Sequence, residues 1–299
     1  MKTESKRKFI RWPVFVVFML VLQMSGLSSA DETKKPVGIN LDVEISSIYN
    51  FRGWNTFQEK SQQDQNGLLA PSITWSIFDT GLSIGYWGAY QISGSNQAEM
   101  VDVGLGHEQD LFLGYSHGWK DDFVVLSAAF TYFFYPFADE DVAGTANPSF
   151  IEPLIGLTIS PWIDISLNLS YFAGLQDAVE DYRYLYINPS LGKSFEFSDR
   201  WGMALGLSVG VKIFNDYDEM KDNVVDVGFD WSFPVTLAGT FYVEPAVHLA
   251  WTNMYSNIMV SSGLDDNPAT PDDESMEERE PTFGDEFMVY FGMNLGADF

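Results

Sequence analysis

Apolar and polar residues alternate along most of the chain, and the alternation has a period of two. In the clearest segment the odd positions are all apolar, and the residues between them are small or polar. The apolar members of that segment are Trp201, Met203, Leu205, Leu207, Val209, Val211 and Ile213. Such a pattern predicts an extended strand with one apolar face. The same test identifies about twelve strands of roughly 10 to 15 residues, long enough to cross a bilayer at a tilt.

The first of these segments is expected over residues 37–51, with its odd positions on the apolar face. Its even positions, among them Asp42 and Glu44, then lie on the opposite face, and Arg52 stands at its outer end. The last segment ends at Phe299, in phase with the apolar positions before it. We therefore expect the first and last strands to pair and to close the sheet.

The connections between the predicted strands are alternately short and long. Short turns are expected at 79–81, 120–122, 160–161, 198–199 and 234–239, and longer polar loops at 55–66, 93–107, 138–147, 174–181, 215–223 and 253–284. This layout is typical of an all-β, transmembrane up-and-down antiparallel β-barrel with short periplasmic turns and long extracellular loops. The alternative is a large soluble β core, which has no reason to follow such an alternation.

Aromatic side chains gather near both ends of the predicted strands. Those on the long-loop side are Phe51, Trp54, Tyr90, Tyr135, Tyr171, Phe214, Trp251 and Tyr255, and those on the short-turn side include Phe78, Trp119, Trp162, Trp201 and Phe241. Two such belts are expected where a membrane barrel meets the two headgroup layers of the bilayer.

Residues 1–30 have the organisation of a secretory signal peptide. Basic residues precede a short apolar run from Trp12 to Leu22, and small residues end the segment at Ala30. The run of about eleven residues is shorter than the roughly 20 that a membrane-spanning helix needs. We expect cleavage after Ala30, which leaves residues 31–299 as a single outer-membrane barrel domain.

The composition removes several classes of function. The chain holds 16 Lys and Arg against 42 Asp and Glu, a formal charge of −26, which argues against binding to nucleic acid phosphates. It has no cysteine, which excludes disulfides, thiolate metal sites and cysteine nucleophiles. Neither a cofactor nor a metal site is predicted.

If the apolar phase faces lipid, the other phase faces an enclosed lumen. The candidate pore-lining residues in that phase are Asp42, Glu44, Arg52, Glu152, Asp164, Asp226, Asp230, Glu244 and His248. An acidic lumen concentrates cations and repels anions, so this set favours a narrow conduit. The same carboxylates are compatible with an interior plugged by side chains and inward loops. Arg52 is either a cation at a constriction or the structural partner of a nearby carboxylate.

Clustered carboxylates occupy residues 265–286, in and just beyond the longest predicted loop. Such a cluster can bind calcium or magnesium and so bridge to anionic lipopolysaccharide outside the cell. Its spacing does not match an EF-hand, and a solvated loop is the other interpretation.

A lipid-cleaving enzyme is the main catalytic alternative for a barrel of this size. The histidines are His107, His117 and His248. His248 alternates with Val247 and Leu249 and is expected in the lumen, away from lipid, while His117 lies near a short turn. No serine is placed to pair with a base at the depth of the outer leaflet, so the sequence predicts no enzyme.

Three pieces of the chain carry a family resemblance: residues 47–53 (SIYNFRG), 110–115 (DLFLGY) and 132–136 (YFFYP). The first is similar to the first-strand signature of the TorF family of porin-like proteins, which are proteobacterial outer-membrane barrels. The other two resemble that family's acidic-aromatic-Gly-Tyr strand and its aromatic strand end. The resemblance implies a porin-like protein of a Gram-negative bacterium and supplies no substrate or catalytic residue. The long acidic loop departs from the family pattern.

Two functions from different classes follow from this sequence. The first is an outer-membrane channel for passive diffusion of small neutral or cationic solutes. The second is a closed structural barrel that acts as a surface scaffold, or as a divalent-dependent contact to lipopolysaccharide or a partner. In both cases the expected partners are outer-membrane lipid, lipopolysaccharide and the barrel assembly machinery. The period of two does not report whether the lumen is open.

Overall fold

The computed structural model describes residues 38–57, 65–93, 107–136, 138, 147–177, 179, 182–214, 223–253 and 287–299. The predicted signal peptide at residues 1–30 and the acidic stretch at residues 265–286 lie outside these ranges, as does almost all of the predicted loop at 253–284. No helix within the described ranges is long and apolar enough to cross a membrane.

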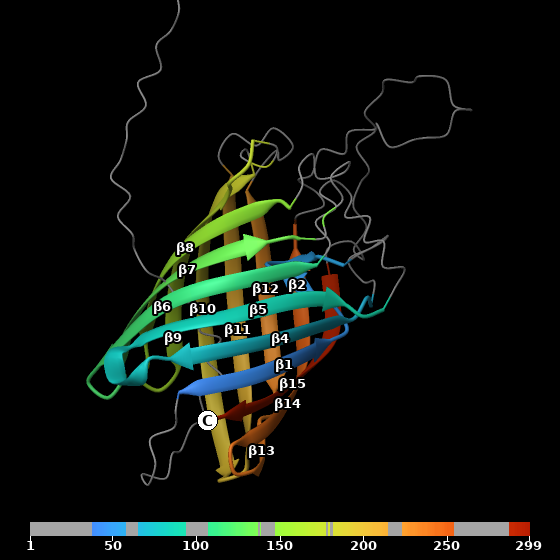
Figure 1. The fold of residues 1–299 in the computed structure, drawn as a ribbon. Helices are drawn as coiled ribbons and strands as arrows, with labels where there is room; N and C mark the ends of the chain where they lie inside the picture. Colours follow the sequence, from blue (N-terminus) through green and yellow to red (C-terminus); the bar gives the residue numbers. More distant parts are fainter. Residues whose placement is uncertain are drawn as a thin grey trace, which may run out of the picture.

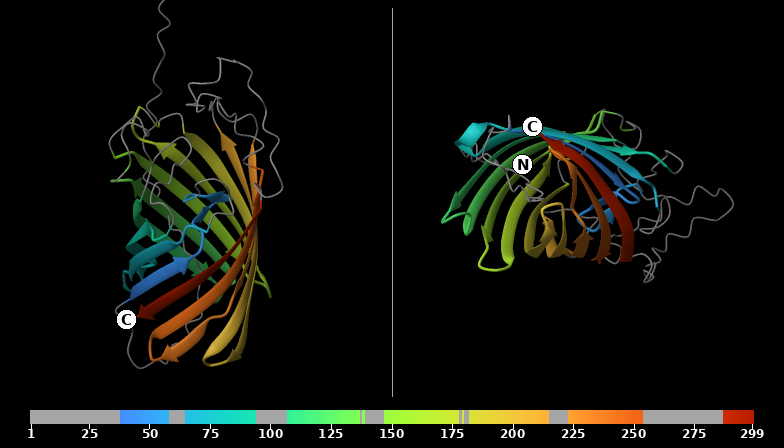
Figure 2. Two further views of the ribbon diagram at one scale, coloured as in Figure 1. Left: turned by 90° about the vertical axis from the view of Figure 1, so that its right-hand side faces the viewer. Right: turned by 90° about the horizontal axis from the view of Figure 1, so that it is seen from below.

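The strands form a closed ring in which each strand is antiparallel to both neighbours (Figure 1). They are β1 (Ile39–Ser46), β4 (Leu68–Ser76), β5 (Leu82–Gln91), β6 (Glu108–Trp119), β7 (Val124–Phe134), β8 (Ser149–Ile159), β9 (Asp164–Gly174), β10 (Arg183–Ser198), β11 (Trp201–Phe214), β12 (Val224–Ser232), β14 (Phe241–Thr252) and β15 (Phe287–Asp298). The short β13 (Val235–Ala238) continues the course of β12 along β14, so the described chain forms a 12-strand barrel. Figure 2 shows the ring from a second side and from below.

The first and last strands close the ring. β1 pairs with β15 from Asn40 opposite Asp298 to Ser46 opposite Gly292, and β10 pairs with β11 on the far side. At the end of this seam the backbone amide of Gly38 donates a hydrogen bond to the Phe299 carbonyl at 2.7 Å. The predicted up-and-down antiparallel barrel is confirmed, including its closure by the two terminal strands.

Side chains alternate between the two faces of the wall, as the period of two predicts. On β11 the apolar Val209 and Ile213 are 36% and 37% exposed, whereas Lys212 is buried inside the ring. Large apolar side chains such as Leu167 on β9 and Phe291 on β15 are exposed on the outer surface in the same way. A continuous outer surface of this kind is unfavourable in water and is the surface that a membrane barrel presents to lipid.

The connections are alternately short and long, and the two kinds lie at opposite ends of the barrel. β4 and β5 are joined through the 3-10 turn η1 (Phe78–Thr80), and the links at 120–123, 160–163, 199–200 and 239–240 are equally brief. The remaining links are 47–67, 92–107, 135–148, 175–182, 215–223 and 253–286. We call the two ends the short-turn end and the long-loop end; they are the periplasmic and the extracellular end of an outer-membrane barrel, respectively.

The first strand is shorter than predicted, because the chain leaves the wall after Ser46 and folds into the lumen. Residues 47–57, which we call the inner segment, contain the two-residue strands β2 (Asn50–Phe51) and β3 (Trp54–Asn55), paired as a small hairpin. In this segment Ile48 and Phe57 are each 1% exposed. Ile48 packs with Met288 and Tyr290, and Phe57 packs with Tyr49, so these apolar side chains are shielded from water inside the barrel.

The position of the inner segment in the lumen corrects part of the aromatic belt that was predicted at the long-loop end. Phe51 and Trp54 belong to the inner segment, and Phe51 packs against Phe133 and Phe172 from the wall. Tyr135 is 5% exposed, and its hydroxyl donates a hydrogen bond to the buried Glu108 carboxylate. These rings therefore lie inside the barrel, whereas Tyr171 is exposed on the outer surface as predicted.

Candidate functional site

The interior of the barrel has two halves with different linings. In the long-loop half, bulky side chains pack into a buried cluster that consists of Phe133, Tyr135, Phe150, Phe172, Val179, Tyr184 and Tyr186. In the short-turn half the inward positions are mostly small and polar, and residues such as Ser72, Thr158, Ser166 and Ser208 are only half-buried. The long-loop half is therefore filled by protein, and the short-turn half is accessible to solvent.

The inner segment is anchored to the wall through Glu108 on β6. The hydroxyl of Tyr49 donates a hydrogen bond to Glu108 Oε2 at 3.0 Å, and that of Tyr135 donates to the same oxygen at 2.8 Å. Burial and the nearby Glu108 charge raise the pKa of both tyrosine hydroxyls well above its ordinary value, so both stay protonated and act as donors. Residues 47–53 and 132–136, two of the pieces that resemble the TorF family, thus meet at one carboxylate.

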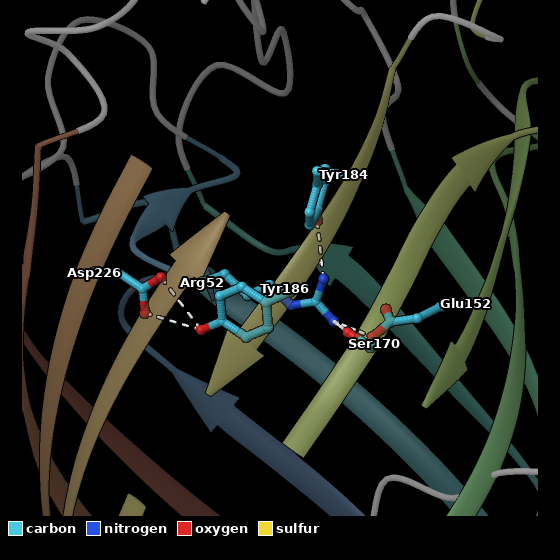
Figure 3. Close-up of polar contacts among 6 residues, drawn as sticks. All are labelled: Arg52, Glu152, Ser170, Tyr184, Tyr186 and Asp226. Carbon is cyan, nitrogen blue, oxygen red and sulfur yellow. Dashed lines mark hydrogen bonds and ion pairs between the residues drawn. The ribbon is translucent and has the colours of Figure 1, made fainter. Parts of the chain in front are cut away.

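Arg52 stands at the tip of the hairpin and reaches across the lumen to the opposite wall (Figure 3). It adopts a left-handed backbone conformation with φ 54°, next to Gly53 at φ 81°. Its Nη1 donates to the Tyr184 hydroxyl at 3.0 Å, and its Nη2 donates to Glu152 Oε1 and to Ser170 Oγ, the latter at 3.5 Å. One guanidinium therefore ties the inner segment to β8, β9 and β10.

Aromatic faces surround the same guanidinium. The Arg52 Cζ atom lies 4.3 Å from the ring centroid of Tyr186, 4.8 Å from that of Phe51 and 5.6 Å from that of Tyr184. Rings at these distances attract a cation through their quadrupole. The Tyr186 hydroxyl in turn donates to the two carboxylate oxygens of Asp226 on β12, at 3.0 and 3.2 Å (Figure 3). We call the wall residues Glu152, Ser170, Tyr184, Tyr186 and Asp226 the Arg52 cage.

Opposite charges lie close together in and beside the cage. Burial lowers the pKa of Arg52, but the Glu152 carboxylate and the neighbouring tyrosines more than offset this, so the pKa lies above its ordinary value and Arg52 stays charged. Lys212 on β11 is 1% exposed, and its Nζ lies 5.8 Å from the ring centroid of Tyr184. Two buried cations thus accompany the two buried carboxylates Glu152 and Asp226.

Two glycines leave room for this close packing. A Cβ atom on Gly53 would lie 2.6 Å from Asp226 Cβ, and one on Gly210 would lie 2.1 Å from the Tyr186 hydroxyl and 2.3 Å from Asp226 Oδ2. Neither distance is compatible with a side chain. The tip of the inner segment and the wall of the cage can approach each other only because these positions lack one.

A second set of polar residues lines the short-turn half. Asp230 Oδ1 lies 2.5 Å from His248 Nδ1, and the His248 ring stacks on Tyr290 at a centroid distance of 4.5 Å. Asp42 accepts a hydrogen bond from the Tyr242 hydroxyl at 3.1 Å, and Glu244 accepts one from Ser232. The side chain of Asp230 is nevertheless 51% exposed, so solvent reaches this part of the lumen.

Arg52 belongs to the inner segment, and the other predicted pore-lining residues lie in the inward phase of the wall strands, but together they do not form one site. Arg52, Glu152 and Asp226 meet at the cage in the long-loop half. Asp42, Glu44, Asp164, Asp230, Glu244 and His248 belong to the short-turn half, and Asp164 is exposed at the first residue of β9. Within the described residues, no group of three or more His, Cys, Asp and Glu could hold a metal ion.

The sequence did not predict a role in the interior for five residues that the structure places there: Tyr49, Glu108, Tyr135, Tyr184 and Tyr186. Tyr184 and Tyr186 had a visible signal, because they occupy the polar phase of a strand whose apolar phase carries Leu185 and Ile187. Aromatic residues in the inward phase of a barrel strand indicate a filled interior at that depth. Tyr49 had no such signal, because it continues the apolar phase of β1.

The environment of the outer surface follows from closure and from apolarity together. The ring pairs every strand on both sides, and its outer face is apolar. In hydrocarbon, strands satisfy their backbone hydrogen bonds only when the sheet closes into a barrel. The chain is an outer-membrane β-barrel.

Comparison with known proteins gives a likeness of fold. No protein-family model matches the chain, and no curated protein matches it. An outer membrane channel from Pseudomonas putida F1 is 10% identical with a TM-score of 0.47, covering 92% of this chain and 100% of that one. The NanC porin is 9% identical (TM-score 0.44, covering 87% and 98%), and LpxR from Salmonella typhimurium is 7% identical (TM-score 0.45, covering 87% and 100%).

Proposed function

We propose that this barrel is a porin-like channel for passive diffusion of small neutral or cationic solutes across the outer membrane. The observation that carries the proposal is the short-turn half of the lumen, where acidic side chains face an interior that solvent reaches. Asp230 is half exposed there, although it belongs to the inward face of its strand. Carboxylates inside a low-dielectric wall raise the local concentration of cations and repel anions.

In the described conformation the proposed path is closed at the long-loop half. The inner segment and the aromatic cluster fill that half, and Arg52 fastens the segment to the far wall. Passage of a solute therefore requires the inner segment to move aside. We propose that Arg52 and its cage are the contacts that break when the channel opens.

Planar-bilayer recording of the refolded protein tests this proposal. The decisive variant is Arg52→Asn, because asparagine tolerates the left-handed backbone at this position and removes the charge. We expect brief openings for the wild-type protein and a several-fold higher open probability for Arg52→Asn, with a reversal potential that favours cations. Channel events that favour anions, or a silent Arg52→Asn barrel whose folding has been verified by heat-modifiable migration, would contradict the proposal.

The packed long-loop half also favours a second candidate, a closed structural barrel that serves as a surface scaffold or as a divalent-dependent contact to lipopolysaccharide or a partner. Such a barrel would remain silent in the bilayer when Arg52 is replaced. The predicted contact residues of the acidic stretch lie outside the described residues. Binding of calcium to vesicles that contain lipopolysaccharide and the barrel is the measurement that would support this candidate.

We also propose that the chain has no catalytic activity. His248 contacts Asp230 and the Tyr290 ring inside the lumen. His117 lies near a short turn, parallel to the Tyr115 ring and edge-to-face with Trp119. Among the described residues, neither histidine forms a hydrogen bond with a serine. We expect no acyl-ester hydrolysis by the refolded protein. Hydrolysis that disappears in His248→Ala would overturn this part of the proposal.

The partners that we propose are outer-membrane lipid, lipopolysaccharide, small solutes and the barrel assembly machinery, with no role for nucleic acid. The apolar outer face supports the first two, and Phe299, an exposed aromatic residue next to β15 and in phase with its lipid-facing residues, supports the last. Depletion of the assembly machinery should leave the chain outside the membrane fraction. Deletion of Phe299 should reduce insertion without changing secretion.

We also propose that this outer-membrane barrel belongs to the TorF family. Its support is that the resembling pieces 47–53 and 132–136 pack together through Glu108, next to the third piece at 110–115. A structure of a TorF member in which the corresponding first piece lines the outer wall, rather than the lumen, would contradict this assignment.

A further inference from the structure

The Arg52 cage has the features of a cation-binding site, and the guanidinium group of Arg52 occupies it. Glu152 and Asp226 are 2% and 6% exposed, and Lys212 beside them is 1% exposed. Arg52 forms an ion pair with Glu152, while Lys212 and Asp226 attract each other electrostatically. Among these four residues, positive and negative charges are equal in number only while Arg52 is present.

Displacement of the inner segment removes one positive charge from the cage. Arg52 is the one charged residue between Ser47 and Phe57. When it leaves, Glu152 loses its ion-pair partner, and the hydroxyl oxygens of Ser170 and Tyr184 lose their donor. Removal of one member of a buried ion pair is strongly unfavourable, so the open state gains stability from any monocation that fits the vacated space.

The geometry of the cage selects the shape of that cation. Glu152 Oε1, Ser170 Oγ and the Tyr184 hydroxyl accept hydrogen bonds from the two terminal nitrogens of one planar group. The Tyr186 ring covers a face of that group at 4.3 Å, and it remains in the wall when the segment leaves. A planar cation with two N–H groups reproduces both sets of contacts, whereas sodium or a compact ammonium reproduces neither completely.

Lys212 limits the charge of the occupant. Its Nζ faces the same Tyr184 ring that the Arg52 guanidinium faces. A dication in the cage would meet this second buried positive charge, whereas a monocation restores only the charge that Arg52 supplies. The site is therefore suited to a single positive charge.

We propose that the Arg52 cage is a binding site for small planar monocations, the guanidinium and amidinium compounds, which take the place of the Arg52 side chain in the open channel. This inference rests on the proposed function, since the site becomes available when the inner segment leaves. It names the solute class that the channel retains on its way through: a guanidinium group carried by a small molecule. In the closed state Arg52 acts as a tethered competitor for the same contacts.

The test uses methylguanidinium as the probe and the full-length refolded barrel. In Arg52→Asn, methylguanidinium should interrupt the single-channel current at concentrations about tenfold lower than those needed for sodium or tetramethylammonium at equal ionic strength. A tenfold difference in affinity corresponds to about 1.4 kcal/mol in binding free energy. The same probe should raise the temperature of thermal unfolding of this variant. Wild-type protein should require higher concentrations, because Arg52 already occupies the site.

Arg52→Asn combined with Glu152→Gln is the matched control, and the advantage of methylguanidinium should disappear in it. If Arg52→Asn conducts but treats methylguanidinium and sodium alike, the inference is wrong and the proposed channel stands. If the barrel is silent but methylguanidinium still raises its unfolding temperature in a Glu152-dependent way, the site stands and the channel is wrong. Arg52→Gly, which also suits the left-handed backbone, replaces Arg52→Asn in every arm if the latter does not fold.

Discussion

At the scale of single residues, Arg52 is held by charge and by shape together. An ammonium group in the same place would keep the attraction to Glu152, but it would lose the parallel hydrogen bonds and most of the contact with the Tyr186 face. The sequence left two interpretations of Arg52 open, a constriction cation or a structural partner. The described conformation places it as a structural partner of Glu152, Ser170 and Tyr184 inside the lumen.

The Tyr49 hydroxyl gives the first residue-scale prediction. Tyr49→Phe removes one of the two tyrosine hydroxyls that donate to the buried Glu108 carboxylate and leaves that of Tyr135. We expect a loss of about 1 to 3 kcal/mol in the free energy of unfolding, because a buried charged group loses part of its solvation. Urea-dependent unfolding in lipid vesicles measures this loss.

Tyr171→Phe is the control for that experiment. Tyr171 is 39% exposed on the outer surface, so the same chemical change there should leave the unfolding free energy nearly unchanged. An equal loss in both variants would mean that the bond from Tyr49 to Glu108 does not stabilise the inner segment.

At the scale of elements, the strands could be predicted and the inner segment could not. The wall strands place apolar residues against lipid and small or polar residues against the lumen, so the period of two identifies them and their faces. Tyr49 and Phe51 continue the apolar phase of β1, yet they face aromatic rings of the interior. Hydrocarbon and a packed aromatic cluster are both apolar, so alternation alone does not distinguish a strand that continues from one that turns inward.

Gly210 on β11 gives the element-scale prediction. A methyl group there would collide with the Tyr186 hydroxyl and with both carboxylate oxygens of Asp226, so Gly210→Ala should displace the cage. We expect a loss of about 1 to 3 kcal/mol in the free energy of unfolding from overpacking, together with more frequent channel openings. Unfolding in vesicles and bilayer recording measure the two effects.

The matched control lies on the same strand and the same face. A Cβ atom on Gly206 would approach Asp230 no closer than 3.4 Å, which is an ordinary contact. Gly206→Ala should therefore leave both stability and gating nearly unchanged. Equal effects of the two substitutions would show that β11 responds to any added side chain, and that the cage is not the sensitive element.

At the scale of the whole molecule, the barrel joins a filled half to a half that solvent enters. The ring, its strand order, its closure and the alternating connections follow from patterns that extend over the whole sequence. The division of the lumen does not, since it depends on rings that come together from β7, β8, β9 and β10. The inward Tyr184 and Tyr186 indicate a filled interior at their depth, but the packing of these rings is visible only in the structure.

Ion selectivity is the prediction at this scale. Asp230→Asn with Glu244→Gln removes two inward carboxylates from the short-turn half. A unit charge about 7 Å from an ion contributes about 0.6 kcal/mol in bulk water, so the two removals should lower the ratio of cation to anion permeability several-fold. Reversal potentials in a salt gradient, recorded in the Arg52→Asn background, measure the ratio.

Asp79→Asn serves as the control, because Asp79 lies in the turn η1 between β4 and β5 and not on the inward face of a strand. Its removal should leave the permeability ratio unchanged. A similar fall in both variants would mean that the net charge of the protein, rather than the lining of the lumen, sets the selectivity.

The filled half also has an electrical consequence. Water in the short-turn half is continuous with the solution on that side, so an applied voltage falls mainly across the packed layer that contains the inner segment. Moving one elementary charge through the whole drop is worth about 2.3 kcal/mol per 100 mV. Because Arg52 is the sole charge in the inner segment, a potential that is negative on the long-loop side pulls this segment outward, and the opposite polarity presses it back into place.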